Sequence, residues 1–370
     1  MTEPPAAAIT TMVTEVVGDR PDAWDLAGRL PLDVVRRLGS AGVLCPQVPD
    51  TFGGLAMSSV AAGELTAHVG SLCSSLRSVM TSQGIAAWVV HRLGDPDQRK
   101  EHLPRLTGGE LAAVAFSEAG AGSDLSAMTT RIEAGDDHVV VSGSKVWVTG
   151  AVYADLLLVF GRYGDGAAVA LVPISAPGVV VRPLPAPLGC RAAGHADVRL
   201  DRVRVPTDRV LGGAGMPLPW LVTSALAHGR LSVAWGCAGI LRCCLAAAAR
   251  HARTREQFGK PLSEHQLVGR HLAELLVAEQ AATQLCGYAS RCWDAGSPEL
   301  VPATVTAKHF AAGAAARGAA AAVQVLASAG ARDGHPVARA YRDAKMMEII
   351  EGSNEISQLL LAQHAVAVWG

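Results

Sequence analysis

The sequence predicts a mainly α-helical protein with a central β domain, built from an N-terminal helical domain, an antiparallel β domain and a C-terminal four-helix bundle. Three observations carry this prediction. Helical hydrophobic periodicity runs up to about residue 112, short β-rich runs separated by turns fill 113–219, and long helical patterns return from 220 to 370. We therefore predict domains at 1–112, 113–219 and 220–370.

The N-terminal part shows apolar residues at three-four spacing, as an amphipathic helix requires. One such stripe includes Leu32, Val35 and Leu38, and another includes Ile85 and Val89. Glycine and proline separate the stripes, and no hairpin signal interrupts them. We expect helices throughout this part.

The middle part changes period from helix to strand. Short runs rich in β-branched residues are expected as strands at 128–133, 138–142, 145–149, 156–160, 168–173, 179–183, 197–200 and 203–206. Because no helices separate these runs, an antiparallel sheet is favoured over βαβ units. The glycine-rich segment Gly120–Asp124 lacks the third glycine of a dinucleotide-binding turn, which also argues against a Rossmann fold.

The C-terminal part reads as long packed helices. Apolar residues from Leu267 to Trp293 follow three-four spacing, and Thr304–Gly330 is rich in alanine. Small side chains allow helix axes to approach closely, as in a tight bundle.

Composition and charge bound the possible functions. Of 370 residues, 50% are hydrophobic and 18% charged, which is typical of a globular chain. A net charge of −1 leaves no electrostatic footprint for nucleic acid or an anionic membrane. The first residues lack the features of a signal peptide, and the uncharged run Leu211–Gly229 is broken by prolines and glycines. None of the eight cysteines forms a CxxC pair or a zinc-spaced cluster, so we expect reduced thiols, no metal and a cytoplasmic location.

The clearest chemical signal lies at Tyr341–Leu361. A helical pattern stops at Gly352, and Ser353 can cap a new helix through its hydroxyl. Glu351 is thereby placed at a tight corner with apolar neighbours. Poor solvation there raises the proton affinity of a carboxylate and suits it to act as a base. This stretch alone is also compatible with a surface Glu at a helix end.

Three further motifs agree with the terminal one: Ala115–Asp124, Lys145–Ala151 and Arg253–Leu262. Together the four motifs resemble the acyl-CoA dehydrogenase family of flavoproteins, and the resemblance covers nearly the whole chain. It implies FAD as cofactor and a thioester of coenzyme A or an acyl carrier protein as substrate. It also implies an electron acceptor such as electron transfer flavoprotein.

The resemblance implies roles for individual residues. Glu351 would be the catalytic base, removing the proton α to a thioester carbonyl. Trp147 and Thr149 alternate onto one face of a strand and would lie against the flavin. Trp147 taken alone is also compatible with an aromatic residue of the hydrophobic core. The full implied cofactor set is Phe116, Ser117, Ser123, Trp147, Thr149, Arg255, Phe258, Gln266, Gln324, Ser353 and Glu355, and the implied substrate set is Ser123, Arg230 and Gly352.

Phe258 and Gln324 match positions that reach FAD from a neighbouring subunit, so the resemblance implies a homodimer or homotetramer. The chain departs from the family pattern at Ala119, where proline is usual, at Ala327–Gly330, where a glycine-rich stretch is usual, and at Ile350, where an aromatic residue is common. None of these changes removes a group that the reaction needs.

Within the family, the amino-acid sequence at 117–126 and 256–269 resembles that of the acyl-carrier-protein dehydrogenases of methoxymalonyl extender-unit pathways in polyketide synthesis. That resemblance implies a three-carbon, glycerate-derived unit oxidised toward hydroxymalonyl carrier protein. Three alternatives stay open at this point: a catabolic short-chain acyl-CoA dehydrogenase that performs α,β-desaturation, a flavin monooxygenase, and a non-catalytic scaffold that binds carrier protein.

Overall fold

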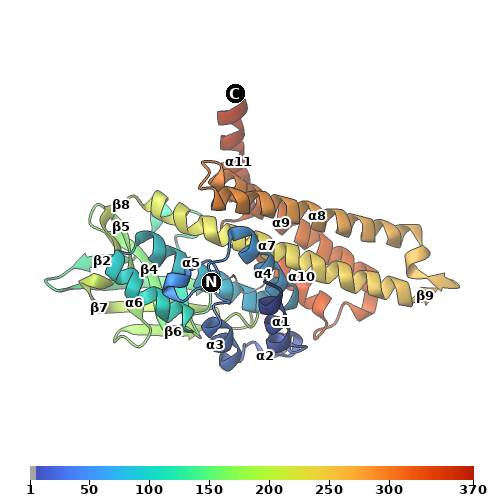
Figure 1. Ribbon diagram of the computed structural model, residues 1–370, viewed down its shortest axis with the longest axis horizontal. Helices are drawn as coiled ribbons and strands as arrows, with labels where there is room; N and C mark the ends of the chain where they lie inside the picture. The colour runs from blue at the N-terminus through green and yellow to red at the C-terminus, as the bar shows by residue number, and fades with distance from the viewer. Residues whose placement is uncertain (1–5) are drawn as a thin grey trace.

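The computed structural model describes residues 6–370 and has an elongated shape, with the sheet at one end and the bundle at the other (Figure 1). The N-terminal helices lie between these two ends. Their bounds are α1 Ala6–Val17, α2 Pro21–Ala27, α3 Leu32–Ser40, α4 Ser59–Leu72, α5 Ser74–Leu93 and α6 Pro96–Thr107. The predicted helical nature of this part is confirmed. Helix α5 is buried along most of its length and contacts both strand β1 and helix α7, so it links the sheet to the bundle.

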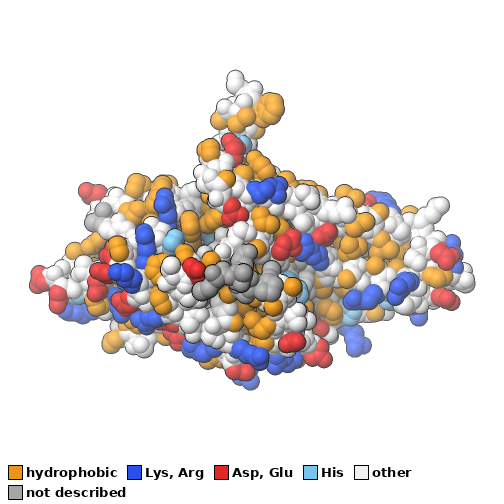
Figure 2. All heavy atoms as spheres, viewed as in Figure 1, with side chains coloured by type: hydrophobic (Ala, Val, Ile, Leu, Met, Phe, Trp, Pro, Cys, Tyr) orange, Lys and Arg blue, Asp and Glu red, His pale blue; other side chains and the backbone are white. Residues whose placement is uncertain are grey.

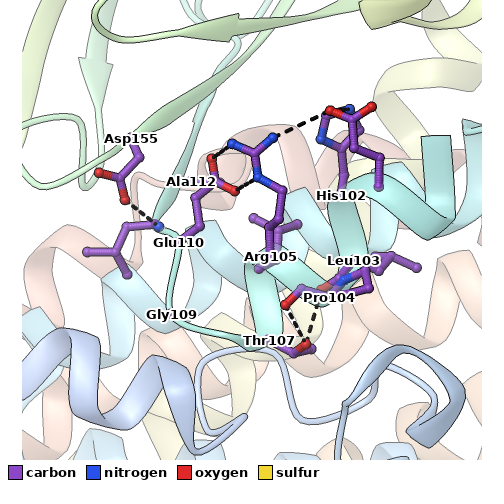
Figure 3. A network of polar contacts seen from close by, with 12 residues as sticks. His102, Leu103, Pro104, Arg105, Thr107, Gly109, Glu110, Ala112 and Asp155 are labelled. Atoms are coloured by element: carbon purple, nitrogen blue, oxygen red, sulfur yellow. Dashed lines mark hydrogen bonds and ion pairs between the residues drawn. The ribbon is translucent and has the colours of Figure 1, made fainter.

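A polar network joins the N-terminal helices to the sheet (Figure 3). Near the end of α6, Arg105 Nε lies 2.6 Å from Glu110 Oε2. One residue later, the backbone N–H of Leu111 donates to Asp155 Oδ2 at 2.9 Å. Asp155 also pairs with Arg36 of α3, with 2.8 Å between Nη2 and Oδ1. The chain therefore enters the first strand at a position held by contacts from three elements.

The sheet has eight strands: β1 Ala112–Ala115, β2 Arg131–Ala134, β3 His138–Val148, β4 Leu156–Tyr163, β5 Gly166–Pro173, β6 Val179–Pro183, β7 Ala196–Pro206 and β8 Val210–Met216. The order is β6-β7-β3-β2-β4-β5-β8, and β1 pairs with β4. Most pairings are antiparallel, as expected, but β4 pairs in parallel with β1 and β2. Strands β1 and β8 were not predicted, because β1 is four small residues long and β8 contains three glycines.

Two pairs of predicted strands are single strands in the structure. The runs 138–142 and 145–149 both belong to β3, and 197–200 and 203–206 both belong to β7. Register shifts occur between Val141 and Gly143 and between Lys145 and Val148, where β3 bulges against β7. A bulge inserts an unpaired residue and looks like a strand end in the sequence pattern.

The C-terminal helices are α7 Leu218–Thr254, α8 Gln266–Asp294, α9 Leu300–Leu326, α10 Pro336–Met347 and α11 Asn354–Trp369. Helix α7 packs against α8, α9 and α10 around a core in which alanine and cysteine predominate. This confirms the predicted alanine-rich bundle. Helices α7 and α9 are long and apolar enough to cross a membrane, but most of each apolar stretch is buried in the bundle. Between α7 and α8, the short hairpin β9 (Glu256–Gln257) and β10 (Lys260–Pro261) lies at the far end of the molecule.

Helix α11 stands out from the body of the molecule (Figures 1 and 2). Its first turns touch α9, but several apolar side chains further along it are exposed, including Leu359, Val366 and Trp369. A helix that leaves this many apolar side chains exposed among residues 6–370 is typical of a contact with another molecule.

Candidate active site

Glu351 lies on the connection between α10 and α11. The predicted helix was expected to continue to residue 352, but α10 ends at Met347 and residues 348–352 form a turn. Glu351 has a φ of 56° and Gly352 a φ of 89°, so both occupy the left-handed region. Glycine adopts this conformation without steric cost, whereas glutamate does not. The strain at Glu351 is characteristic of a functional site held in place by its surroundings.

The carboxylate of Glu351 packs directly against helix α7 at Gly229. A Cβ placed on Gly229 would lie only 2.1 Å from Glu351 Oε2, so the absence of a side chain there makes room for the carboxylate. Oε2 is buried and, among residues 6–370, has no hydrogen-bond partner. Burial raises the pKa of Glu351 above its usual 4.5, and the cations Arg230, Lys308 and Arg77 partly oppose that rise. A buried, unpartnered carboxylate with a raised pKa has the properties of a general base.

Two buried cations hold the backbone of the corner. Arg230 Nε, on α7, donates to the carbonyl oxygen of Glu351 at 3.2 Å. Lys308 Nζ, on α9, donates to the carbonyl oxygen of Gly352 at 2.7 Å. Burial lowers the pKa of Lys308 to about 8, which still leaves the amine mostly charged at neutral pH. Because both cations bind carbonyls, the corner is fixed without a salt bridge that would neutralise the base.

A second group of residues gathers at the β3 bulge. Trp147 has a φ of 56° and is half exposed, and its ring lies 5.6 Å from that of His195. The Thr149 hydroxyl is 3.2 Å from His195 Nδ1. Trp147 and Thr149 thus both lie next to His195, in agreement with the expectation that the two side chains face the same way. The reason differs from the prediction, because β3 ends at Val148 and the bulge, rather than simple alternation, sets the direction of Trp147.

His195 was not identified from the sequence. It is buried, and no residue of the described chain forms a hydrogen bond with its Nε2. Burial lowers the pKa of His195 to about 4, so the ring is neutral at physiological pH. A buried polar atom without a partner usually marks the place of a ligand or a water.

The motif around Phe116 and Ser117 is held by a buried ion pair. Lys145 Nζ donates to the Phe116 carbonyl and to Glu118 Oε1, each at 2.9 Å. The Ser117 carbonyl accepts from the N–H of Val146 at 2.9 Å. Both carbonyls are therefore used within the protein. Further along the loop, Ser123 is exposed.

Glu118 is the anchor of this motif. It accepts hydrogen bonds from the backbone and hydroxyl groups of Thr129 and Thr130. Although burial alone would raise it, these bonds and the Lys145 ammonium hold the pKa of Glu118 at about 2. The position after Glu118, where the family usually has proline, is Ala119, and the motif is held in place without it.

A third group lies away from Glu351, around the β9–β10 hairpin. Arg255 follows the last residue of α7, Phe258 is 95% exposed at the hairpin tip, and Gln266 begins α8. Gln324, near the end of α9, is also exposed and lies toward the same end, because α8 and α9 form an antiparallel pair. The chain does not bring these four residues to the carboxylate.

The remaining predicted residues lie where α11 begins. Ser353 is the N-cap of α11, and its hydroxyl accepts from the N–H of Ile356 at 3.4 Å. Glu355 is exposed in the first turn. Three of the first N–H groups of α11 are already used within the chain: Asn354 donates to the Glu348 carbonyl, Ile356 to the Ser353 hydroxyl and Ser357 to the Ser353 carbonyl. An anion at this helix start would therefore meet the positive end of the helix dipole rather than a set of free donors. The predicted cap of α11 is confirmed.

Comparison of the sequence with protein-family models identifies the family to which this fold belongs. Models of the acyl-CoA dehydrogenase N-terminal, middle and C-terminal domains match residues 6–110, 113–203 and 220–366. The chain belongs to the acyl-CoA dehydrogenase family. Glutaryl-CoA dehydrogenase of Desulfococcus multivorans is 31% identical over 94% of this chain and 92% of its own length. The human mitochondrial short-chain specific acyl-CoA dehydrogenase is 30% identical, over 90% of this chain and 82% of its own.

A solved structure is considerably more similar to this acyl-CoA dehydrogenase family member. FkbI, described as acting in biosynthesis of the methoxymalonyl extender unit of the FK520 polyketide, is 60% identical, with a TM-score of 0.93. The similarity covers 97% of this chain and 99% of FkbI. The predicted fold class, and the resemblance on which it was based, are confirmed.

Acyl-CoA dehydrogenases are FAD-dependent oxidoreductases that act on acyl thioesters. The residues of this chain fit that cofactor. A half-exposed indole, a threonine hydroxyl and a buried histidine whose Nε2 has no partner among residues 6–370 lie together, and the start of α11 presents the positive end of a helix dipole. The unpartnered carboxylate of Glu351 is suited to the acyl group that such a cofactor oxidises.

Proposed function

We propose that this dehydrogenase oxidises a short acyl unit carried by an acyl carrier protein, a three-carbon, glycerate-derived unit on the way to hydroxymalonyl carrier protein. The observation that carries the proposal is the 60% identity to FkbI over 97% of the chain. Such a product would be an extender unit for polyketide synthesis. The domain boundaries at 112/113 and 219/220 and the site roles given above are part of the same proposal.

Glu351 acts as the base in this reaction. Its carboxylate is buried and unpartnered, and burial raises its pKa, so it is well prepared to accept a proton from the acyl group. Bound FAD supplies the hydride acceptor. Oxidation of the C3 alcohol to an aldehyde removes one proton and one hydride. Oxidation of the hydrated aldehyde to the carboxylic acid removes a second proton and hydride, with water supplying the added oxygen, so a single base suffices for each step. A positioned base contributes roughly 10²–10⁴ in rate.

The thioester carbonyl is expected to lie against the backbone N–H of Glu351. Within residues 6–370, that N–H donates no hydrogen bond. Arg230 and Lys308 hold the carbonyls of Glu351 and Gly352, which follow that N–H in the chain, and so help to fix the corner. A donor aimed at the developing negative charge on the carbonyl contributes about 10²–10³ in rate. Gly352 and Arg230 thus act on the substrate through this corner, and the exposed Ser123 is expected to contact the substrate nearer the surface.

The cofactor is expected to extend from Trp147, Thr149, Phe116 and Ser117 toward the start of α11. Phe258 and its neighbours lie too far along the bundle to complete that site within one chain. We therefore propose a homodimer or homotetramer, in which the hairpin groups Arg255, Phe258 and Gln266, with Gln324, complete a neighbouring subunit's cofactor site. The 95% exposure of Phe258 and the apolar exposed face of α11 support this assembly. Sedimentation that shows only monomers with bound FAD would contradict it.

A second candidate is an ordinary short-chain acyl-CoA dehydrogenase. The observation in its favour is the similarity to the glutaryl-CoA and short-chain enzymes across most of the chain. That candidate predicts rapid flavin reduction by short acyl-CoA and α,β-unsaturated products. An electron acceptor such as electron transfer flavoprotein completes turnover in either case.

The deciding experiment uses the FAD-loaded enzyme without oxygen. Glyceryl and partly oxidised three-carbon units are supplied on carrier protein and, separately, on coenzyme A. Flavin reduction and intact mass of the carrier protein are recorded. On carrier protein we expect one reduced flavin for each loss of two hydrogens from the alcohol unit, or for each gain of one oxygen atom by the aldehyde unit. The reaction on coenzyme A should be much slower. Rapid reduction by butyryl-CoA alone would favour the second candidate.

Substitution of the base provides the matched control. Glu351→Gln keeps the size of the side chain and removes its basicity. We expect this variant to retain FAD and bind substrate, but its rate of flavin reduction should fall by a factor of about 10²–10⁴. A variant that reduces flavin at the wild-type rate would contradict the role of Glu351 and favour a non-catalytic scaffold or a different base.

A further inference from the structure

Two cavities adjoin beside the contact between helices α5 and α7. The inner cavity, of about 30 Å³, lies among α4, α5 and α7, and the outer cavity, of about 370 Å³, lies between the loop after α3, helix α5 and the end of α8. Gln47, Gly84 and His228 line both cavities, so the two meet at these residues. Asp294 lines the outer cavity and is exposed, so that cavity reaches the surface.

Polar atoms without partners line both cavities. Ser59 is 2% exposed, and its Oγ has no hydrogen-bond partner among residues 6–370. The same holds for the buried Nδ1 atoms of His228, at the junction, and of His91, in the outer cavity. Burial lowers the pKa of His228 to about 4, so its ring is neutral and needs a hydrogen bond rather than a counter-ion. Buried polar atoms of this kind usually bind water, and the inner cavity has room for about two water molecules.

A pair of hydroxyl groups connects the inner cavity to the base. Ser232 of α7 lines the cavity, and its Oγ lies 2.6 Å from Thr81 Oγ1 of α5, with either group able to donate. Ile85 follows Thr81 by one turn of α5. A Cβ on Gly229 would meet both Glu351 Oε2, at 2.1 Å, and Ile85 Cδ1, at 3.0 Å, so the isoleucine lies beside the carboxylate. The hydroxyl pair is therefore about one helical turn from the base.

His228 stands at the point where the two cavities meet. A Cβ on Gly84 would lie 2.5 Å from His228 Cε1, so only glycine at that position leaves room for the imidazole ring. On another side, the ring lies edge-on to Trp293, with 5.7 Å between centroids, and Trp293 packs on Trp88 at 4.6 Å. The size and polarity of residue 228 therefore decide whether the cavities communicate.

The proposed reaction needs such a connection. Each oxidation leaves a proton on Glu351, which must lose it before it can accept the next one. Between the two oxidations, one water molecule must add across the aldehyde C=O to form the hydrate. During both steps the carrier's pantetheine arm is expected to occupy the path past Ser123. A second route to solvent would let the base recover while the acyl unit stays bound.

We propose that the two cavities form a water passage, the rear passage, which leads from Glu351 to the surface at Asp294. The proton leaves Glu351 through the Thr81–Ser232 hydroxyl pair and the waters bound at Ser59 and His228, and water enters by the same route to hydrate the retained aldehyde. The occupant is water rather than the end of a longer acyl chain, because an acyl chain would leave the polar atoms of the lining unsatisfied. This inference rests on the proposed function and adds the route by which its water and protons move.

Crystals of the FAD-loaded wild-type enzyme test the occupant directly. We expect ordered water molecules within hydrogen-bond distance of Ser59 Oγ and His228 Nδ1, continuing to the Ser232 hydroxyl. A dry inner cavity would overturn the inference. So would an inner cavity filled by the acyl chain in a complex with butyryl-pantetheine.

A single-turnover experiment tests the route. The FAD-loaded enzyme is mixed without oxygen with the carrier-bound alcohol unit in weak buffer. Flavin absorbance, a pH indicator and a fluorescent label on the carrier protein are followed together. In the wild type we expect one proton per reduced flavin, released before the carrier protein dissociates. His228→Phe places an apolar ring at the junction and should reduce flavin near the wild-type rate but release the proton about tenfold or more slowly, because the apolar ring excludes the bridging water.

His228→Asn is the matched control, because its side chain is smaller than imidazole and remains polar. It should release the proton as promptly as the wild type. Prompt release in His228→Phe, or release from the wild type only when the carrier protein dissociates, would overturn the inference and leave the proposed function standing. Equal slowing of flavin reduction and proton release in His228→Phe would also overturn it and indicate a packing role. If no carrier-bound thioester reduces the flavin, the proposed function fails, and this inference fails with it.

Discussion

Gly229 contacts Glu351, so adding a single methyl group at Gly229 should affect the catalytic rate and the stability of the protein differently. Gly229 lies in the interior of helix α7, and an added Cβ would lie 2.1 Å from Glu351 Oε2 and 3.0 Å from Ile85 Cδ1. An ordinary contact begins at about 3.4 Å, so in Gly229→Ala the carboxylate oxygen must retreat by about 1.3 Å. The isoleucine methyl needs to yield by only a few tenths of an ångström.

The two consequences of Gly229→Ala have opposite signs. Misplacing a catalytic group by about 1 Å costs about 10²-fold in rate, so we expect kcat to fall by roughly that factor. Alanine is favoured over glycine in a helix interior by about 0.5–1 kcal/mol. Because the clashing oxygen belongs to the end of a flexible side chain, we expect stability to be unchanged or slightly increased.

The assay combines single-turnover flavin reduction with thermal unfolding. Gly287→Ala on α8 is the matched control, because its Cβ would meet only the end of the Arg291 side chain, at 3.3 Å. The control should gain similar stability and keep the wild-type rate. Wild-type flavin reduction in Gly229→Ala would refute the reasoning, since the carboxylate would then not need the space over α7. A large loss of stability would show that the corner cannot yield.

Three further predictions concern charge. Because Glu351 must be ionised to act and burial raises its pKa, kcat/KM should rise with pH along a limb whose midpoint lies above 4.5; a limb at or below 4.5 would contradict this. Lys308→Met removes a cation that lowers that pKa, so the limb should move to higher pH, and an unmoved limb would show that the lysine only holds the loop. Glu118, whose pKa is held at about 2 against a usual 4.5, contributes stability that is present above pH 4.5 and lost as pH falls toward 2. In Glu118→Gln that acid dependence should weaken, and the unpaired Lys145 should cost about 3–5 kcal/mol in urea unfolding; a loss below 1 kcal/mol would contradict the anchoring role.

The order of elements was readable from the sequence because hydrophobic periodicity is a local property. Helical patterns at both ends and β-rich runs between them predicted the three parts, and the Gly352–Ser353 signal located the start of α11. Strands β1 and β8 escaped prediction, and β3 and β7 were each divided in two. Their boundaries depend on bulges and on pairing with distant strands, which no local pattern records.

The candidate site divides in the same way. Glu351, Trp147 and Thr149 stood in recognisable motifs, so the residues that we propose to carry the chemistry could be named from the sequence. Arg77 and Lys308 had only a weak signal, because each is one of three basic residues in its helix, and Gly229 and His195 had none. Their importance depends on contacts across α5, α7, α9 and the sheet. The sequence by itself therefore determined which groups the protein has for its reaction. The tertiary structure alone decided their solvation and charge environment, because burial and the field of neighbouring cations arise only when distant segments pack together.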